Sequence, residues 1–332
     1  MKGPEFRLPM TTARKIILSL SIGILAGTGV YLLPVSTLYQ GAHLGDLLPP
    51  LFSLNNFVAG RPVYGGQYFN NTPVTPYPFT MILALYPISL LPLFLAGPVF
   101  FGIVSAVFAC SLLHDGKPWR LLVLLSPPYI LSLYGVQIVP LLCSAYFMRF
   151  LLPVACFKPH IGLMLCASGD WKMRYVLATI LYLLLCFAVY PSWLLDWLTH
   201  GNFSCYEGKA PIFFGAGFLL LASMYKWRDR RSRLLAAMSV LPQRLWYDQL
   251  MIFFIPETFP QLCFLLAGSW FSFLVSMIYG WLWQKGMQHS GSWHMVVHFV
   301  YIPALFMIFR NELIKIVSGT RERLRSIGLK HW

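Results

Sequence analysis

The chain has 332 residues, of which 58% are hydrophobic and only 11% are charged. A soluble domain carries roughly 25% charged residues, so this composition excludes an ordinary water-soluble globule. The net charge of +14 would suit a nucleic-acid-binding protein, but the basic residues lie in short loops between apolar runs. Because such loops are typical topology signals that face anionic lipid, we expect an all-α polytopic membrane protein and no nucleic-acid partner.

The first predicted element is a transmembrane helix over residues 16–33, preceded by Arg14 and Lys15. The run ends at Pro34 without a convincing small-residue cleavage site, so we interpret it as an uncleaved span and not a signal peptide. The segment 34–78 follows, which is rich in proline and is the longest non-spanning stretch of the chain. We expect it to form a long first external loop of short interfacial helices with a functional purpose.

The next apolar segments are interrupted by proline. Residues 79–95 contain Pro87 and Pro92, and residues 96–113 form a better span. The segments 121–134 and 138–150 follow as shorter apolar runs. Residues 151–168 are too short for two spans and contain Lys158, so we expect a broken hairpin with Lys158 at its turn.

The remaining apolar runs cover residues 175–190, 212–225, 234–241, 250–283 and 296–309, with a break at Pro256–Glu257–Thr258. Together these segments predict a bundle of about eight to ten transmembrane helices within a single transmembrane domain, 1–332. Most Lys and Arg residues precede the first span or lie in 114–120, 170–174, 226–233 and the basic tail 310–332. This bias predicts cytoplasmic N- and C-termini and places 34–78 on the external side.

Acidic residues are scarce, and most of them lie near basic residues in the presumed cytoplasmic segments: Asp115, Asp170, Asp229, Glu312 and Glu322. Asp46 differs, because it is the only carboxylate in the long external segment. A lone carboxylate near apolar surface suits a general base. The alternative is a helix cap, since Gly45–Asp46–Leu47 is a plausible start for a short helix.

Lys158 is the second unusual charge, because it lies amid apolar residues where a charge is costly in lipid. We expect it to face a cavity or an anion, and the alternative is snorkelling to the interface. Asp248 and Gln137 lie at predicted external helix ends, where each is either functional or a simple cap. Trp193 is either part of a site or a member of the interfacial aromatic belt.

Metal ligation has weak support. His294 and His298 have i, i+4 spacing but no adjacent acidic partner, so interfacial packing is favoured over a metal pair. No Cys/His spacing indicates a zinc site. We therefore predict neither a metal site nor a cofactor and leave the need for a divalent cation open.

Several short motifs, taken in order, resemble a known family. They are Gly45–Asp46, Phe57–Val58–Ala59–Gly60–Arg61–Pro62–Val63–Tyr64, Thr75–Pro76–Tyr77–Pro78–Phe79, Gly135–Val136–Gln137, Phe157–Lys158–Pro159–His160, Ser192–Trp193 and Tyr247–Asp248. Over about residues 16–255 the chain resembles the polyprenyl-phosphate-sugar-dependent glycosyltransferases of the GT-C superfamily. The most similar branch is glycosyltransferase family 87 (DUF2029-like), which contains bacterial mannosyltransferases.

The resemblance implies a GT-C-type fold in the bacterial inner (plasma) membrane, with an active site at the external face. It implies inverting transfer of a hexose or pentose, with a mannose-like sugar favoured, from a polyprenyl phosphate to a lipid or glycan acceptor. Asp46 would be the catalytic base, and Lys158 would lie near the lipid phosphate and stabilise the leaving group. The other substrate-binding residues would be Tyr64, Tyr77, Gln137, His160, Trp193 and Asp248.

Two other functions stay open from the sequence. A non-catalytic membrane subunit or scaffold is one, because Phe79 stands where the family often has a second proline and Val136 separates Gly135 from Gln137. A flippase or other transporter for a lipid-linked sugar is the other. Transporters often show internal repeats and paired broken helices, and no repeat is visible in this sequence.

Overall fold

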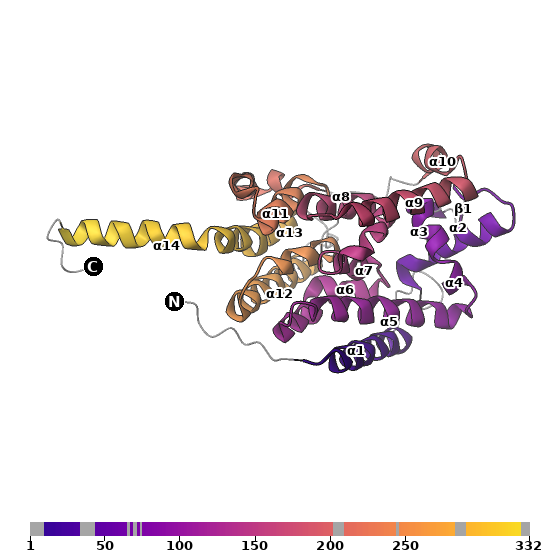
Figure 1. Ribbon diagram of the computed structural model, residues 1–332, viewed down its shortest axis with the longest axis horizontal. Coiled ribbons are helices and arrows are strands. Elements are labelled where there is room, and N and C mark those ends of the chain that lie inside the picture. Colours follow the sequence, from indigo (N-terminus) through magenta and orange to yellow (C-terminus); the bar gives the residue numbers. More distant parts are fainter. Residues whose placement is uncertain are drawn as a thin grey trace. The chain divides into compact units, whose positions relative to one another are not determined.

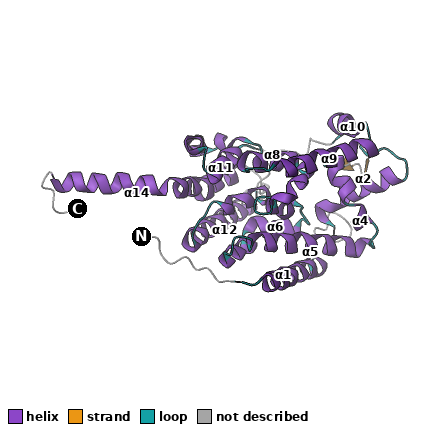
Figure 2. Ribbon diagram, in the orientation of Figure 1, coloured by secondary structure: helices purple, strands orange, loops and turns teal. Residues whose placement is uncertain are grey.

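The computed structural model of the protein is built almost entirely from helices, with one short strand pair (Figures 1 and 2). It describes residues 10–33, 44–64, 67–68, 72–73, 75–201, 209–243, 246–282 and 290–326. Residues 34–43, at the start of the predicted external loop, and residues 327–332, at the end of the basic tail, lie outside the described residues. The chain divides into two compact units, Met1–Ala210 with Leu241–Met251, and Pro211–Val240 with Ile252–Trp332.

The first unit carries the candidate site residues. Its elements up to the second long helix are α1 (Thr12–Leu32), the 3₁₀-helix η2 (Gly45–Leu47), α2 (Leu48–Val58), the antiparallel strands β1 (Gln67–Tyr68) and β2 (Thr72–Pro73), α3 (Phe79–Ala84), α4 (Tyr86–Ser89) and α5 (Leu93–Leu112). The later elements are the 3₁₀-helix η3 (Pro118–Leu125), α6 (Pro127–Tyr134), α7 (Val139–Ser144), the 3₁₀-helix η4 (Arg149–Phe157), α8 (Pro159–Ser168), α9 (Met173–Val189) and α10 (Trp193–His200).

Two long helices of the first unit, α1 and α5, pack against each other along much of their length. Glycines make this close approach possible. A Cβ atom at Gly23 would lie 2.6 Å from the carbonyl oxygen of Gly102, and one at Gly27 would lie 2.7 Å from that of Pro98. Gly23 and Gly27 therefore form a small-residue stripe of the kind that joins helices in lipid, where backbone contact replaces the hydrophobic driving force.

Proline explains why several apolar segments are short. Pro118, Pro127, Pro140 and Pro159 each lie in the first turn of a helix, where the missing N–H costs no hydrogen bond. The residues before Pro118, Pro127 and Pro159 have non-helical conformations, so at these three places a new helix begins in a new direction. The predicted breaks in 79–95 and 151–168 are confirmed, since α3 and α4 precede α5 and a turn at Lys158 separates η4 from α8.

The bend between α9 and α10 measures 83° and follows Pro191. Two hydroxyl groups fix it: Tyr190 Oη and Ser192 Oγ donate to Asp196 Oδ2 at 2.7 and 2.6 Å. Asp196 lies in the first turn of α10, where a carboxylate is favoured by the helix dipole. The bend turns α10 away from the direction of α9.

The second unit contains the 3₁₀-helices η5 (Pro211–Phe213) and η6 (Gly215–Lys226), α11 (Arg230–Val240), α12 (Phe259–Leu282), α13 (Ser290–Val296), the π-helix η8 (Val297–Tyr301) and α14 (Ile302–Ser326). The 3₁₀-helix η7 (Tyr247–Phe254) begins in the first unit and ends in the second. Figure 1 shows α14 as one long helix, coloured yellow. Its apolar part, together with α13 and η8, forms a candidate span over Ser292–Ile316.

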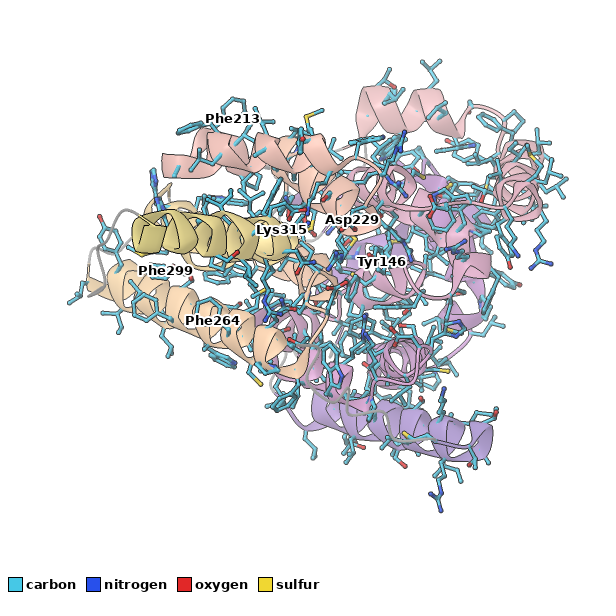
Figure 3. All side chains as sticks on the ribbon, turned by 60° about the vertical axis from the view of Figure 1, so that its left-hand side comes forward. Tyr146, Phe213, Asp229, Phe264, Phe299 and Lys315 are labelled. Carbon is cyan, nitrogen blue, oxygen red and sulfur yellow. The ribbon has the colours of Figure 1, made fainter. Side chains whose placement is uncertain are left out.

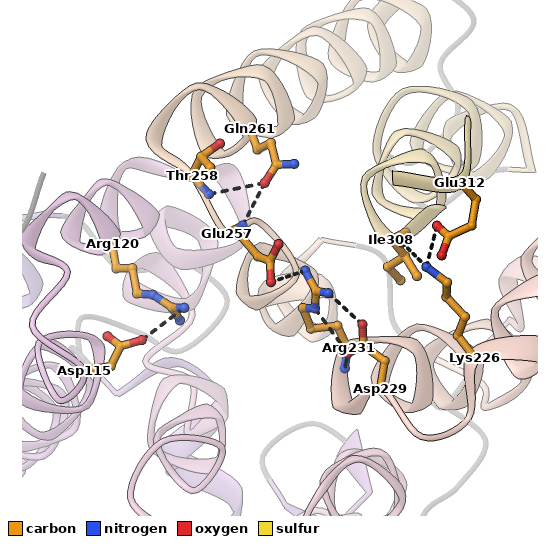
Figure 4. Close-up of polar contacts among 10 residues, drawn as sticks. All are labelled: Asp115, Arg120, Lys226, Asp229, Arg231, Glu257, Thr258, Gln261, Ile308 and Glu312. Carbon is orange, nitrogen blue, oxygen red and sulfur yellow. Dashed lines mark hydrogen bonds and ion pairs between the residues drawn. The ribbon is translucent and has the colours of Figure 1, made fainter. Parts of the chain in front are cut away.

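Ion pairs join the basic segments to the scarce carboxylates, as the sequence predicts (Figure 4). In the second unit, Lys226 Nζ lies 2.7 Å from Glu312 Oε2, and Arg231 contacts both Asp229 and Glu257 at 2.6 and 2.8 Å. In the first unit, Arg120 pairs with Asp115 at 3.2 Å. In each pair at least one partner is partly solvent-exposed, so these contacts contribute little to stability.

Large apolar side chains cover the outside of the spanning helices. Ile24 and Leu25 on α1 are 70% and 71% exposed, and Phe264 on α12 is 63% exposed. Figure 3 shows Phe213 and Phe264 projecting away from the second unit. Exposed apolar surface on this scale is covered by lipid, so the chain is a multi-pass, all-α membrane protein.

The number of long spans differs from the expected eight to ten. Among the described residues, four helices are long and apolar enough to cross a membrane, namely α1, α5, most of α12 and the segment Ser292–Ile316, and the bent pair α9–α10 makes five at most. The prediction counted apolar runs that fold as short helices. The 12-residue 3₁₀-helix η6, for example, extends about 24 Å, less than the roughly 30 Å of the hydrocarbon core.

Candidate active site

Asp46 lies where two turns of the first unit touch. Gly45 has φ +47°, and a Cβ atom there would lie 2.5 Å from the carbonyl oxygen of Gly135, so only glycine fits without a backbone shift. The backbone N–H of Asp46 donates to that same carbonyl at 2.9 Å. The Gly45–Asp46 motif is thus fastened to the Gly135–Val136–Gln137 motif by backbone contacts.

The side chains of the two motifs also meet. Val136 has φ +49°, a strained conformation for a β-branched residue, and the turn directs Gln137 towards Asp46. Gln137 Nε2 donates a hydrogen bond to Asp46 Oδ2. Gln137 is 1% exposed, Asp46 is half-buried, and Gln137 Oε1 has no hydrogen-bond partner among the described residues.

A short helix does form at Gly45–Asp46–Leu47, as the cap alternative for Asp46 expects, but neither Asp46 nor Gln137 is an N-cap residue. The N-cap of η2 is Leu44 and the N-cap of α2 is Leu47, while α7 is preceded by Ile138. The carboxylate and the amide hydrogen-bond to each other instead. A half-buried carboxylate beside a buried, unsatisfied carbonyl oxygen is a place where a ligand with hydroxyl or ammonium donors gains hydrogen bonds.

Lys158, His160 and Asp248 form a second polar group in the same unit. Lys158 Nζ lies 2.7 Å from Asp248 Oδ1, and His160 Nε2 lies 3.0 Å from Asp248 Oδ2. The Lys158 ammonium also lies 4.8 Å from the centre of the Tyr247 ring. Asp248 is completely buried and Lys158 is 6% exposed, so this is a buried ion pair.

Burial decides what this group can do. An isolated charge costs many kcal/mol in a low-dielectric interior, and pairing with further hydrogen bonds makes it tolerable. Lys158 therefore does not snorkel to the interface, and the anion that it faces is the carboxylate of Asp248. Asp248 lies in the first turn of η7. It does more than cap this helix, because one of its carboxylate oxygens pairs with Lys158 and the other contacts His160.

The aromatic candidates are Tyr64, Tyr77 and Trp193, of which the two tyrosines contact each other and Trp193 contacts Phe187. Tyr64 Oη donates to the backbone carbonyl of Tyr77 at 3.3 Å, and burial raises the pKa of the Tyr64 phenol well above its usual range. Trp193 is 4% exposed and lies 5.3 Å from the ring of Phe187, between ring centres. Its indole N–H is buried and has no hydrogen-bond partner among the described residues. This is unusual, because a buried tryptophan N–H normally finds a partner.

The helix α7 links the first two groups. Gln137 precedes α7, and α7 packs against η4 and α8, the two elements that flank Lys158. The Cys143 thiol on α7 lies close enough to Asp248 and Lys158 to interact with them electrostatically. The Asp46 and Lys158 groups therefore both border α7, the first at its N-terminal end and the second near Cys143.

Some contributors to these groups had no functional interpretation from the sequence. Gly135 is part of a sequence motif, but the sequence assigns it no role. In the structure its carbonyl oxygen accepts the hydrogen bond from the backbone N–H of Asp46. Tyr247 likewise appeared only as the neighbour of Asp248, and its ring lies beside the Lys158 ammonium. The φ of Val136 and the ring position of Tyr247 depend on packing between distant segments, which a single sequence does not display.

No metal centre is evident among the described residues, which contain no group of three or more His, Cys, Asp or Glu side chains placed to share an ion. His294 and His298, in the second unit, pack against the backbone of Gly215. His298 Nδ1 lies 2.7 Å from the carbonyl oxygen of His294, and the His294 ring makes an edge contact with Phe214. This arrangement agrees with the packing role that their spacing suggested.

Comparison with known proteins adds no relative: no family model matches the chain, and neither a curated protein nor a solved structure resembles it significantly.

Proposed function

We propose that this chain is an integral membrane glycosyltransferase of the GT-C type. It moves a hexose or pentose, mannose-like in our preferred version, from a polyprenyl-phosphate donor to a lipid or glycan acceptor. Asp46 acts as the general base that takes the proton from the acceptor hydroxyl, and the reaction inverts the anomeric centre. Both termini are cytoplasmic, the Asp46 segment faces the external side, and the membrane is a bacterial inner membrane.

The observation that carries this proposal is the Asp46–Gln137 pair. A general base must be held within hydrogen-bond reach of the proton that it accepts. Gln137 fixes the carboxylate by one oxygen and offers its own unpartnered Oε1 beside it. An acceptor hydroxyl needs an oxygen that receives its proton, and a second hydroxyl of the same sugar is a suitable donor for Gln137 Oε1.

Lys158 supports the donor side of the proposal. An ammonium has three N–H donors, and one of them serves Asp248 at 2.7 Å. The other N–H groups suit the oxygens of a phosphate, and Asp248 keeps the lysine in place when no ligand is bound. Because α7 borders both groups, a ligand whose phosphate lies near Lys158 and whose sugar lies near Asp46 would run along this helix.

The test is to incubate the purified protein in detergent or nanodiscs with a panel of polyprenyl-phosphate sugars and candidate acceptors. The proposal expects release of polyprenyl phosphate and a sugar-bearing product with inverted anomeric configuration for at least one sugar. Absence of both transfer and hydrolysis across the panel would reject the enzyme.

A lipid-linked-sugar flippase is the second candidate, and the broken helices favour it. The η4–α8 turn at Lys158 and the 83° bend between α9 and α10 are interruptions of the kind that line transporter sites. The same panel separates the two functions. A flippase moves a labelled donor between the leaflets of proteoliposomes and leaves its sugar–phosphate bond intact.

A further inference from the structure

The two helices on either side of Lys158 are each about half as long as a membrane is thick. The 3₁₀-helix η4 has nine residues and extends about 18 Å, and α8 has ten residues and extends about 15 Å. The hydrocarbon core measures roughly 30 Å. Neither helix spans it alone.

The two helices also run back along each other. Arg149 opens η4, and its guanidinium Nη1 donates to the carbonyl oxygen of Asp170 just after α8, at 2.8 Å. Between these ends, a Cβ atom on Gly162 would lie 2.2 Å from the carbonyl oxygen of Ala155. The chain therefore reverses at Lys158, and both ends of the hairpin lie together beside exposed Lys172 and Arg174.

The neighbouring span gives an independent measure of depth. The helix α9 begins at Met173, directly after Lys172, and packs along η4. Phe157, adjacent to Lys158, lies 6.0 Å from Tyr182 between ring centres. Tyr182 follows Met173 by nine residues, so the turn lies about 14 Å along α9 from the basic end. This agrees with the lengths of the two hairpin legs.

We propose that residues 149–170 form a re-entrant hairpin that enters and leaves the membrane at the face carrying Lys172 and Arg174. Its tip holds the Lys158–His160–Asp248 group about half-way through the bilayer. The hairpin is lipid-facing on its outer side, where Phe150 and Leu163 are 56% and 57% exposed. The inference concerns the depth of the site and stands whether the chain transfers sugars or not.

The proposed depth accounts for the composition of the group. A charge at mid-membrane is tolerated when it is paired inside the protein, and the completely buried Asp248 supplies that pair. The short helix α3, which follows the predicted external loop, also contacts the hairpin near its tip. Thr80, at the start of α3, donates from Oγ1 to the carbonyl oxygen of Cys156 at 2.7 Å, and its own carbonyl oxygen accepts from Tyr182 Oη. A hairpin from one face thus meets a short helix from the other, as in sites formed by broken helices at the midplane.

Depth measurement by electron paramagnetic resonance tests the hairpin in the full-length chain. A nitroxide is attached through p-acetylphenylalanine, which leaves the native cysteines in place. The exposed labelling positions are Phe150, Leu163 and Asp170 on the hairpin, with Met173 and Leu181 on α9 as shallow and deep references. Collision with oxygen and with a membrane-impermeant nickel chelate, added on one side of proteoliposomes, reports depth and sidedness.

The hairpin predicts that labels at 150 and 170 are as shallow as the label at 173 and respond to the chelate from the same side. The label at 163 is deeper than both and shallower than the label at 181. Labels at 150 and 170 on opposite sides would show a spanning segment. A label at 163 as shallow as that at 170 would show a hairpin lying flat on the surface. Either result overturns the proposal, and matched melting temperatures of the five variants show that each is folded.

Discussion

Lys158 and Asp248 are 90 residues apart in the sequence, and their side chains form a buried ion pair at 2.7 Å. Removing one member leaves the other charged and unpaired in the interior. Such a loss costs about 3–5 kcal/mol, whereas replacing both members with apolar residues of similar size is often neutral. Comparing single and double variants of this pair therefore separates its contribution to stability from its contribution to activity.

We expect Lys158→Met to lower the free energy of unfolding by about 3–5 kcal/mol and Lys158→Met/Asp248→Leu to restore most of that loss. The measurement is thermal or denaturant unfolding in detergent. Lys226→Met is the matched control, because its partner Glu312 is solvent-exposed and an exposed ion pair contributes little to stability. Equal losses in the single and double variants would contradict a buried ion pair. If the glycosyltransferase proposal is right, the stable double variant is inactive.

Gln137 offers a second test, directed at the position of Asp46. Gln137→Ala removes the side-chain hydrogen bond to the carboxylate, and a bond to a charged group is worth about 1.5–3 kcal/mol. If that energy is used to orient the base, transfer slows by about 10- to 100-fold. Gln137→Glu places a second carboxylate there and slows transfer further at neutral pH. Steady-state transfer rates check both variants, and unchanged rates would contradict a positioning role.

The glycine stripe of α1 predicts a stability effect unrelated to the site. Gly23→Ala places a methyl group against the backbone of α5, 2.6 Å from Gly102 O, and we expect a loss of about 1–3 kcal/mol. Gly29→Ala is the control, since the nearest atom to its Cβ would be Leu133 Cδ1 at 3.8 Å. Melting temperatures of the purified variants check the difference. Gly29→Ala should keep or slightly raise the melting temperature, because alanine favours a helix more than glycine does. A melting temperature of Gly23→Ala equal to or above that of Gly29→Ala would contradict the α1–α5 contact.

The pH dependence of the second unit follows from Asp229. Burial alone would raise the pKa of this carboxyl, but the hydrogen bonds and charge of Arg231 outweigh burial and hold the pKa below its usual value. A depressed folded-state pKa stabilises the fold above the unfolded pKa, about 3.9, and that stability is lost as the pH falls through the folded pKa. We expect the melting-temperature difference between the unaltered chain and Asp229→Asn to be constant above about pH 5 and to shrink below pH 4. A difference that grows on acidification would contradict this assignment.

The sequence predicted the parts of the fold that depend on local apolar runs. The helices α1 and α5 lie close to the expected spans, and the breaks near Pro87, Pro92 and Lys158 are present. Fewer helices of the described residues are long enough to span than the eight to ten apolar segments expected, because an apolar run of 10–14 residues looks the same whether it crosses the bilayer or turns back within it. The length of a helix in ångströms depends on its type, because a 3₁₀-helix rises more per residue than an α-helix. Apolar periodicity does not identify 3₁₀-helices such as η4 and η6.

The sequence singles out individual candidate residues but not the groups that they form. Asp46 and Lys158 stood out because each is a charge in an unusual place, which composition alone reveals. The pairings of Asp46 with Gln137 and of Lys158 with Asp248 join segments about 90 residues apart, and only the tertiary fold brings them together. The stripe of Gly23 and Gly27 was visible as a small-residue spacing and could have predicted a close helix contact.

The role of Asp46 as base is the central claim, and its most direct test is the rate of sugar transfer by Asp46→Asn in membranes or nanodiscs. The variant keeps the shape of the side chain and one oxygen that can accept from Gln137 Nε2, but it removes the proton affinity of the carboxylate. We expect transfer to fall by about 10²–10⁴-fold, the usual contribution of general base catalysis, with expression and melting temperature unchanged. Asp170→Asn, at an exposed position after α8, should transfer at the normal rate. Transfer by Asp46→Asn at the unaltered rate would contradict the account.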